Sequence, residues 1–216
     1  MAGRYHSIDD MPRTLGLFPL SGVLLLPRGH LPLNVFEPRY LALVESAISG
    51  SRLIGMIQPT ENEEKALKPA LSAIGCAGRI TAYRETEDGR YLITLTGICR
   101  FRAVEELDTP ASFRAVKPDF GPFAGDLVER EDSEFPRERL LHALTEYLAR
   151  RDLKADWKSV VNAPAETLVN AIAMLCPFEP NEKQALLEAP QWEDRVSTLL
   201  ALLEMAGAAT GSNTVN

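Results

Sequence analysis

The first half of the chain consists of short apolar runs separated by turn-forming residues. Apolar runs of about four to eight residues bounded by Gly, Pro or Ser are typical of β-strands. We therefore predict strands at residues 17–20, 23–26, 31–35 and 53–58. Ser21-Gly22 and Pro27-Arg28-Gly29 supply the turns between the first three. The polar segment 60–72 is expected to form an exposed loop.

A hairpin is the clearest local prediction in this half. Asp88-Gly89 lies between residues 74–85 and residues 90–96, and Asp-Gly is a preferred dipeptide of tight hairpin turns. The second arm alternates apolar and polar residues, which is the period of a pleated strand. Further strands are predicted at residues 99–107 and 113–118. Together these strands predict a small closed or nearly closed sheet.

One helix is predicted inside this β-rich region, at residues 38–49. Pro38 has the fixed φ that suits a first helical position, and Glu37 lies near the positive end of the helix dipole. Leu41, Val44 and Ile48 follow at helical spacing, and Gly50 ends the pattern. We expect this amphipathic helix to pack on the sheet.

Helical spacing replaces the strand pattern in the second half. Apolar stripes predict helices after Pro136, between Pro164 and Pro177, and at residues 182–188 and 192–205. The sequence therefore predicts an α+β fold with five segments. These are an N-terminal segment at 1–14, a β-rich barrel with one packed helix at 15–119, a linker at 120–134, a helical bundle at 135–206 and a disordered tail at 207–216.

The charge of the chain opposes binding to nucleic acid or to an anionic membrane. Of the formal charge of −7, nearly all falls in the second part: through Val128 there are 14 Lys or Arg against 15 Asp or Glu, and from Glu129 there are 9 against 15. Phosphate affinity comes from clustered Lys and Arg that release counterions. No apolar run approaches the roughly 18 residues of a membrane span, and no signal peptide is recognisable, so we expect a cytoplasmic protein.

Cysteine and histidine show no pattern typical of metal ligands. Cys76, Cys99 and Cys176 lie far apart, without C-x-x-C spacing and in apolar surroundings. Such residues are typical of reduced, buried core positions. The three histidines, His6, His30 and His142, are equally scattered. We expect no metal and no cofactor.

Several short motifs of this chain resemble the Lon protease N-terminal domain family, also called the Lon substrate-binding domain. The matching pieces are Pro19-Leu20, Pro27-x-Gly29, Leu31-Pro32-Leu33, Phe36-Glu37-Pro38-Arg39-Tyr40, the strand at 54–57, Gly75-Cys76-Ala77-Gly78 and Leu95-x-Gly97-x-x-Arg100-Phe101. They fall in the family's order, and the resemblance covers about Leu15 to Met205. It implies a PUA-like pseudo-barrel, a compact helical subdomain and a role in binding polypeptide.

The chain carries none of the motifs that would make it an ATP-dependent protease. A P-loop, G-x-x-x-x-G-K-[ST], is absent because the sequence contains no Gly-Lys pair. Ser159 follows Lys158, but neighbours on a helix point about 100° apart and do not form a dyad. We therefore expect a freestanding, non-catalytic protein without the ATPase and protease domains.

Phe36, Glu37, Arg39 and Tyr40 form the most distinctive group of polar and aromatic residues. On one interpretation, Glu37 favours the helix start, Arg39 pairs locally and Tyr40 packs under the barrel. On the other, these residues form the rim of a surface that binds an unfolded or peptide segment or a protein partner. The oligomeric state and the identity of the partner are left open by the sequence.

Other binding hypotheses use other residues. The strand period places Arg100 and Arg102 on one face, where they would contact RNA or a small ligand. A groove between barrel and helices would have Trp157, Phe178 or Trp192 as anchors, although each also suits helix packing. A third hypothesis is a hydrolase with an unrecognised, ATP-independent site, for which no nucleophile and base can be assembled from the motifs.

Overall fold

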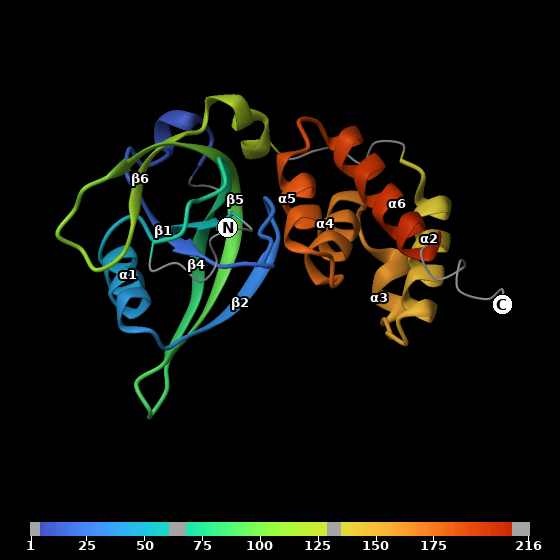
Figure 1. Cartoon of the computed structure of the whole chain (residues 1–216), viewed down its shortest axis with the longest axis horizontal. Coiled ribbons are helices and arrows are strands. Elements are labelled where there is room, and N and C mark those ends of the chain that lie inside the picture. The colour runs from blue at the N-terminus through green and yellow to red at the C-terminus, as the bar shows by residue number, and fades with distance from the viewer. Residues whose placement is uncertain (1–4, 61–67, 129–134, 209–216) are drawn as a thin grey trace.

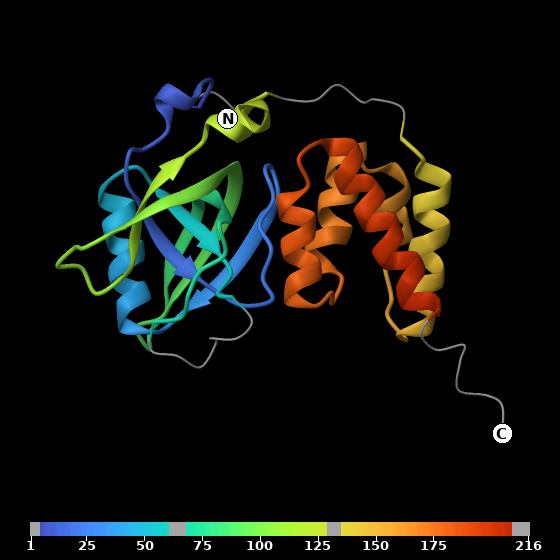
Figure 2. The ribbon, with the colours of Figure 1, turned by 45° about the horizontal axis from the view of Figure 1, so that its top comes forward.

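The computed structural model describes residues 5–60, 68–128 and 135–208. A β-rich part and a helical part lie side by side along the long axis of the molecule (Figures 1 and 2). The elements of the β-rich part are η1 (Ile8–Asp10), β1 (Leu15–Pro19), β2 (His30–Val35), α1 (Pro38–Ser49), β3 (Leu53–Ile57), β4 (Ile74–Glu85), β5 (Tyr91–Leu107), β6 (Ala115–Asp119) and η3 (Gly121–Leu127). Those of the helical part are α2 (Arg137–Arg150), α3 (Trp157–Asn162), α4 (Ala165–Leu175), α5 (Pro180–Glu188) and α6 (Trp192–Ala208).

The sheet of the described residues has six strands in the order β2-β5-β4-β3-β1-β6. Strand β6 pairs with β1 and also with β5, so the sheet closes on itself. Only β1 and β3 run parallel, and the remaining pairs are antiparallel. The predicted hairpin is confirmed: β4 and β5 pair around the turn at Gly89, whose φ of +77° favours glycine.

Two strand predictions need correction. Residues 23–26 form no strand, although Leu24, Leu25 and Leu26 are all buried. They fill the core as irregular chain: a side chain at Gly78 would meet Leu25, and the Leu26 carbonyl lies against Gly97. The apolar run at residues 23–26 therefore indicated burial in the core, but not pairing in the sheet. Strand β5 also continues through Gly97 as one element, where two strands were expected.

The helix at residues 38–49 is confirmed, with a different buried face from the predicted one. Tyr40, Leu43, Val44 and Ala47 are buried, so the apolar stripe is rotated relative to Leu41, Val44 and Ile48. Leu41 and Ile48 are only partly buried. The helix packs on β1 and β3 because its buried side chains face that part of the sheet.

The helical part contains one helix that the sequence pattern did not predict. Helix α3 has six residues and no buried side chain, so it leaves no apolar stripe. The expected linker at 120–134 is also partly folded, since η3 buries Phe123 and Asp126. The rest of the linker at 129–134, most of the loop at 60–72 and the tail from residue 209 lie outside the described residues.

Polar contacts join the sheet to the helices. Arg100 on β5 donates to the carbonyls of Leu187 and Ala189 at the end of α5, at 3.1 and 2.6 Å. Lys183 Nζ donates to the Gly22 carbonyl at 2.9 Å, and Asn170 Nδ2 donates to the Pro27 carbonyl at 2.9 Å. One cluster of buried apolar residues runs from α1 and the sheet into the helices. The two parts are therefore packed against each other through a shared core.

Candidate functional site

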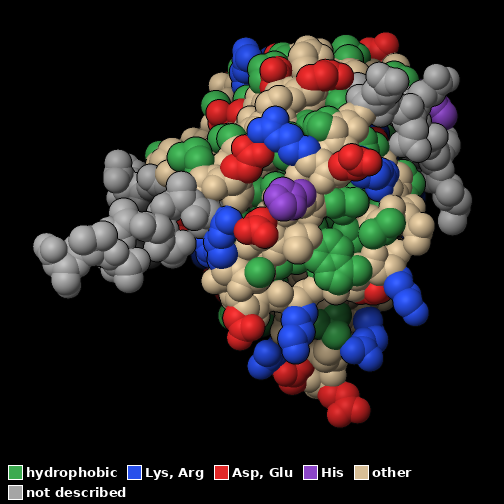
Figure 3. Space-filling model, turned by 90° about the vertical axis from the view of Figure 1, so that its right-hand side faces the viewer, with side chains coloured by type: hydrophobic (Ala, Val, Ile, Leu, Met, Phe, Trp, Pro, Cys, Tyr) green, Lys and Arg blue, Asp and Glu red, His purple; other side chains and the backbone are tan. Residues whose placement is uncertain are grey.

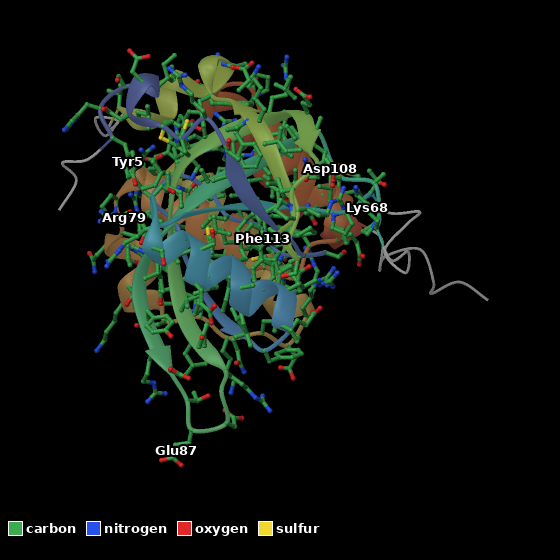
Figure 4. All side chains as sticks on the ribbon, turned by 90° about the vertical axis from the view of Figure 1, so that its left-hand side faces the viewer. Tyr5, Lys68, Arg79, Glu87, Asp108 and Phe113 are labelled. Carbon is green, nitrogen blue, oxygen red and sulfur yellow. The ribbon has the colours of Figure 1, made fainter. Side chains whose placement is uncertain are left out.

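A hollow of about 470 Å³ lies beside the start of α1. Its lining combines apolar and charged side chains from five separate stretches of the chain. The lining residues are Pro19, Leu20, Ser21, Glu37, Arg39, Tyr40, Pro59, Lys68, Pro69, Ser112, Phe113 and Arg114. Figure 4 shows this side of the molecule, with Phe113 close to α1 and Lys68 toward the edge. Three of the four residues singled out in the sequence thus lie at one hollow.

Tyr40 forms part of the wall and is held from two sides. Its ring stacks on Phe18, with centroids 4.1 Å apart and planes 13° from parallel, and its hydroxyl donates to the Pro19 carbonyl at 3.4 Å. The guanidinium of Arg39 lies 4.7 Å from the centre of the same ring. Burial raises the pKa of the Tyr40 phenol, so the group stays protonated and neutral at physiological pH. Tyr40 is therefore fixed in place, and because it is only 8% exposed it contributes little accessible surface to the hollow.

Glu37 and Arg39 form an ion pair at the rim. Arg39 Nη2 and Nε donate to Glu37 Oε2 at 2.7 and 3.0 Å. Both side chains are close to half exposed, so the pair contributes little to stability. Its carboxylate and guanidinium retain free positions for further hydrogen bonds. The local pairing expected for Arg39 is therefore present, and the pair also lies at the hollow.

Phe36 is not part of this lining. Its side chain is 62% exposed, and the guanidinium of Arg90 from the β4–β5 hairpin lies 5.9 Å from its ring centre. Near this hairpin, Tyr83 and Tyr91 meet edge to face at 5.1 Å. The chain turns at Glu37 from strand into helix, and neighbouring residues consequently point to different places.

The opposite wall of the hollow was missed by the sequence analysis. Arg114 Nε and Nη2 donate to the two carboxylate oxygens of Glu106 at 2.9 and 2.8 Å, and Lys68 Nζ lies 3.0 Å from the same carboxylate. Hydrogen bonds from Arg114 and then from Lys68 lower the pKa of Glu106. Lys68 lies 38 positions before Glu106, and all three residues are far along the chain from Tyr40, so no spacing rule could have grouped them with the start of α1. A second hollow of about 330 Å³ shares Phe113 and extends the site.

Arg100 and Arg102 do not form a shared exposed face. Arg102 is exposed, but Arg100 is 5% exposed and pairs with Asp126 at 2.9 Å. The guanidinium of Arg100 also lies 4.7 Å from the centre of the Phe123 ring. Both Asp126 and Phe123 belong to η3, so this folded segment, part of the expected linker, covers the Arg100 side chain. Of the predicted ligand face, only Arg102 is accessible.

The described residues do not assemble groups for nucleophilic or metal chemistry. Burial raises the pKa of Cys99 to about 12 and that of Cys176 to about 11, and raises the pKa of Cys76 as well. All three thiols are thus protonated and inert at neutral pH. Ser159 donates to Asp156 at 2.7 Å, which fixes a helix start and forms no pair with Lys158. No cluster of three His, Cys, Asp or Glu suited to a metal occurs in the described part of the chain.

The fold thus combines a closed sheet, a packed helix and a hollow of mixed character. The family model of the ATP-dependent protease La (LON) substrate-binding domain matches residues 14–205. The chain therefore belongs to this family. Within the described residues, no helix has the length and apolar character needed to cross a membrane.

Solved structures and curated relatives agree with this assignment. A Lon N-terminal domain protein from Xanthomonas campestris has a TM-score of 0.60 at 24% identity and covers 87% of this chain and 97% of its own. The N-terminal domain of Mycobacterium avium complex Lon protease has a TM-score of 0.56 at 14% identity. This match covers 90% of this chain and 98% of the other. Lon protease 2 of Myxococcus xanthus is 26% identical over 90% of this chain. The chain spans about a quarter of the length of such curated relatives, 24% in this case.

Proposed function

We propose that this protein binds polypeptide segments through the hollow beside the start of α1, without catalysing a reaction on them. The observation that carries the proposal is the meeting of Glu37, Arg39 and Tyr40 with Phe113 and Arg114 around one accessible hollow. Membership of a substrate-binding family supports the same role. The segment bound is an exposed apolar stretch of an unfolded chain or of a partner protein.

The chemistry of the lining suits an extended peptide with an apolar side chain. Leu20 and Phe113, which are partly exposed, supply apolar surface, and a volume of about 470 Å³ falls within the range of roughly 300–1,000 Å³ found for ligand pockets. The Glu37–Arg39 pair at the rim offers a donor and an acceptor to the peptide backbone. Recognition would therefore depend on an apolar anchor and would tolerate many sequences.

The test is a titration with a fluorescein-labelled apolar peptide from an unfolded casein. Fluorescence anisotropy should rise with protein concentration, and Phe113→Ala should weaken binding at least about tenfold, since it removes an aromatic anchor worth about 1.4 kcal/mol or more. Phe36→Ala is the matched control, because this aromatic side chain is exposed and lies outside the lining. Equal affinity of both variants, or no binding at high micromolar protein, would contradict the proposal. A thermal melt of Phe113→Ala checks its fold.

We also propose a division of the chain into two structural units. We infer that residues 15–119 form a PUA-like pseudo-barrel and residues 135–206 a helical bundle that together present the site. Closure of the sheet by β6 supports the first unit, and packing of α2 on α6 supports the second. Limited proteolysis of the whole chain tests the division: first cuts between residues 119 and 135 support it, and first cuts inside 15–119 or 135–206 contradict it.

Two other functions receive less support from the residues. RNA or small-ligand binding was hypothesised through Arg100 and Arg102. Arg100 is buried and paired with Asp126, so its guanidinium is not accessible to such a ligand. An ATP-independent hydrolase would need an activated nucleophile, and the thiols are protonated while Ser159 bonds to Asp156. Incubation of the repurified protein with casein, with and without ATP, distinguishes binding from cleavage.

A further inference from the structure

Strands β2, β5 and β4 present one face to solvent. Residues directly opposite each other in antiparallel strands share a face, and three rows of such residues cross this one. The rows are His30, Thr96 and Arg79; Pro32, Thr94 and Ala82; and Asn34, Leu92 and Arg84. None of these nine residues is buried, whereas Ile80, Ile93 and Leu95 on the other face are. We call the three rows the outer sheet face.

A β-bulge brings two arginines of β4 to the outer sheet face. Arg79 and Arg84 are five positions apart, so strict alternation along a strand would put them on opposite faces. Thr81 is an extra residue at a register shift, and the alternation changes there. Arg79 consequently lies opposite Thr96 and Arg84 opposite Leu92, two residues of β5 that share a face. Spacing in the sequence would have separated the two arginines.

Hydroxyl groups hold this bulge in place. Thr81 Oγ1 donates to the Thr94 carbonyl at 3.2 Å and lies 3.0 Å from Thr96 Oγ1. Thr96 Oγ1 also lies 3.0 Å from His30 Nδ1 on β2, the strand at the end of the sheet order. These contacts cross three strands, so the bulge is tied into the sheet. Bulges commonly serve to re-aim side chains next to functional sites.

The outer sheet face carries positive charge that the fold does not neutralise. Among the described residues, neither Arg79 nor Arg84 forms an ion pair, and Arg79 Nε has no hydrogen-bond partner. Arg90, just beyond the last row, is paired with Asp88 at 2.8 Å. The three rows contain no carboxylate, because Glu85 belongs to the other face of β4. In a chain of net charge −7, this face is therefore a local positive surface.

The face continues along the projecting β4–β5 hairpin. In Figure 3, which views the molecule from its helical end, Lys and Arg side chains lie around the lower end, where the hairpin projects in Figure 1. Figure 4 shows the hairpin from the opposite side, with Glu87 at its tip and Arg79 beside the body of the protein. The acidic tip of the hairpin is thus well separated from Arg79.

The shape and spacing of the face suit an extended chain. Its middle row of Pro32, Thr94 and Ala82 has small side chains, so a bound backbone can lie close to the sheet. Arg79 and Arg84 are four residues of β5 apart, which corresponds to about 13 Å at a rise of about 3.3 Å per residue. An extended peptide covers the same distance between positions i and i+4, whose side chains point to the same side.

We propose that the outer sheet face binds an extended acidic segment of a partner protein, with carboxylates at positions i and i+4 that pair with Arg79 and Arg84. A guanidinium can bind a carboxylate through two parallel hydrogen bonds, and neither arginine has a carboxylate partner of its own. A nucleic acid suits the face less well, because the three rows contain no Phe, Tyr or Trp on which bases could stack. This surface is separate from the hollow at α1 and does not rest on the function proposed there.

The experiment compares two short Thr- and Val-rich peptides of identical composition. One carries Glu at positions i and i+4 and the other at i and i+3; only the first pair points to one side of an extended chain, whereas both pairs do so on a helix. Amide shifts of the 15N-labelled whole protein should give about fivefold tighter binding of the i, i+4 peptide at low salt, and a smaller ratio at high salt. Equal binding of both peptides, or no shifts with either, would overturn the proposal.

Two arginine variants locate the binding. Arg84→Gln removes one of the two charged contacts, so it should weaken binding of the i, i+4 peptide about fivefold and abolish the preference over the i, i+3 peptide. Arg102→Gln is the matched control, because Arg102 is an exposed arginine of β5 outside the three rows, and it should leave the affinity unchanged. Equal losses in the two variants would refute the assignment to this face. Phe113→Ala should bind the peptide normally, which separates this surface from the hollow at α1.

A single-stranded nucleic acid is the competing occupant of the face. Titration of the same labelled protein with a short oligothymidine distinguishes the two. Absence of shifts at the amides of Ala82 and Thr94, together with shifts there on addition of the i, i+4 peptide, supports the proposal. An oligonucleotide that shifts these amides and binds more tightly than the peptide would overturn it.

Discussion

The guanidinium of Arg100 and the carboxylate of Asp126 meet through two side-by-side hydrogen bonds. Arg100 Nε donates to Asp126 Oδ2 and Nη2 donates to Oδ1, both at 2.9 Å, and both residues are buried. The remaining nitrogen of the fork, Nη1, donates to the Leu187 and Ala189 carbonyls of the helical part. One side chain thus links strand β5, the η3 segment and the end of α5. It is one of several polar contacts that join the sheet to the helices, together with those of Lys183 and Asn170.

Removing Asp126 should destabilise the protein strongly. Asp126→Ala leaves the buried Arg100 cation without its partner, which costs about 3–5 kcal/mol of the free energy of unfolding. Urea denaturation measures the loss. Arg102→Gln, on the exposed face of the same strand, is the control and should change stability by less than about 0.5 kcal/mol. Adding Arg100→Met to Asp126→Ala should restore part of the loss, and an Asp126→Ala loss below about 1 kcal/mol would contradict this account.

Gly97 should tolerate no side chain. A Cβ atom at this position would lie 2.0 Å from the Leu26 carbonyl oxygen, which is backbone and cannot rotate away. The backbone of Gly97 is also bound to the turn, since its N–H donates to Gly29 at 2.9 Å. Gly97→Ala should lower the free energy of unfolding by about 1–3 kcal/mol or more. Gly125→Ala, whose Cβ would meet no atom within 4 Å, should have little effect; equal melting temperatures of the two variants would disprove the clash.

Stability should fall with rising pH above about 9 because of the buried thiols. The ordinary pKa of a thiol is 9.0, and burial raises the pKa to about 12 for Cys99 and about 11 for Cys176. Below pH 9 these thiols are protonated in both states, and their contribution to stability is complete. Above it the unfolded chain loses protons that the folded chain retains, so each thiol lowers the free energy of unfolding by about 1.4 kcal/mol per pH unit until its folded pKa is reached.

Chemical denaturation between pH 8 and 11 measures this slope. Cys176→Ala should make the decline shallower by about 1 kcal/mol per pH unit in that range. Comparison with the parent protein cancels the titration of Lys and Tyr, which occurs in both. An unchanged slope in Cys176→Ala would show that this thiol does not contribute.

The two tryptophans should differ in their contribution to stability. Trp192 is 6% exposed at the start of α6, whereas Trp157 on α3 is 39% exposed. Trp192→Ala should cost about 3–5 kcal/mol, as is usual for a buried aromatic residue, and Trp157→Ala about 1 kcal/mol or less. Urea denaturation followed by circular dichroism gives both values. A larger loss for Trp157→Ala would mean that α3 is more firmly packed than its exposed residues indicate.

The start of α1 shows how far local sequence could predict the site. Pro38 and Gly50 fixed the bounds of the helix, and the motif from Phe36 to Tyr40 indicated a binding surface. Local sequence could not tell that Phe36 points elsewhere, nor that Phe113 and Arg114 form the opposite wall. Phe113 and Arg114 lie more than seventy positions after Tyr40, and only the tertiary fold brings them to the same hollow.

The sequence by itself determined the change from a β-rich to a helical half, the β4–β5 hairpin and the family, because these depend on period, turn residues and short motifs. Tertiary structure alone decided that residues 23–26 are buried without pairing, that η3 is folded and that Arg100 is an internal link. An arginine on a strand has the same local pattern whether it faces solvent or a carboxylate. The role of Arg100 is set by Asp126, which lies on a different element, and by the surrounding core, which excludes water from the ion pair.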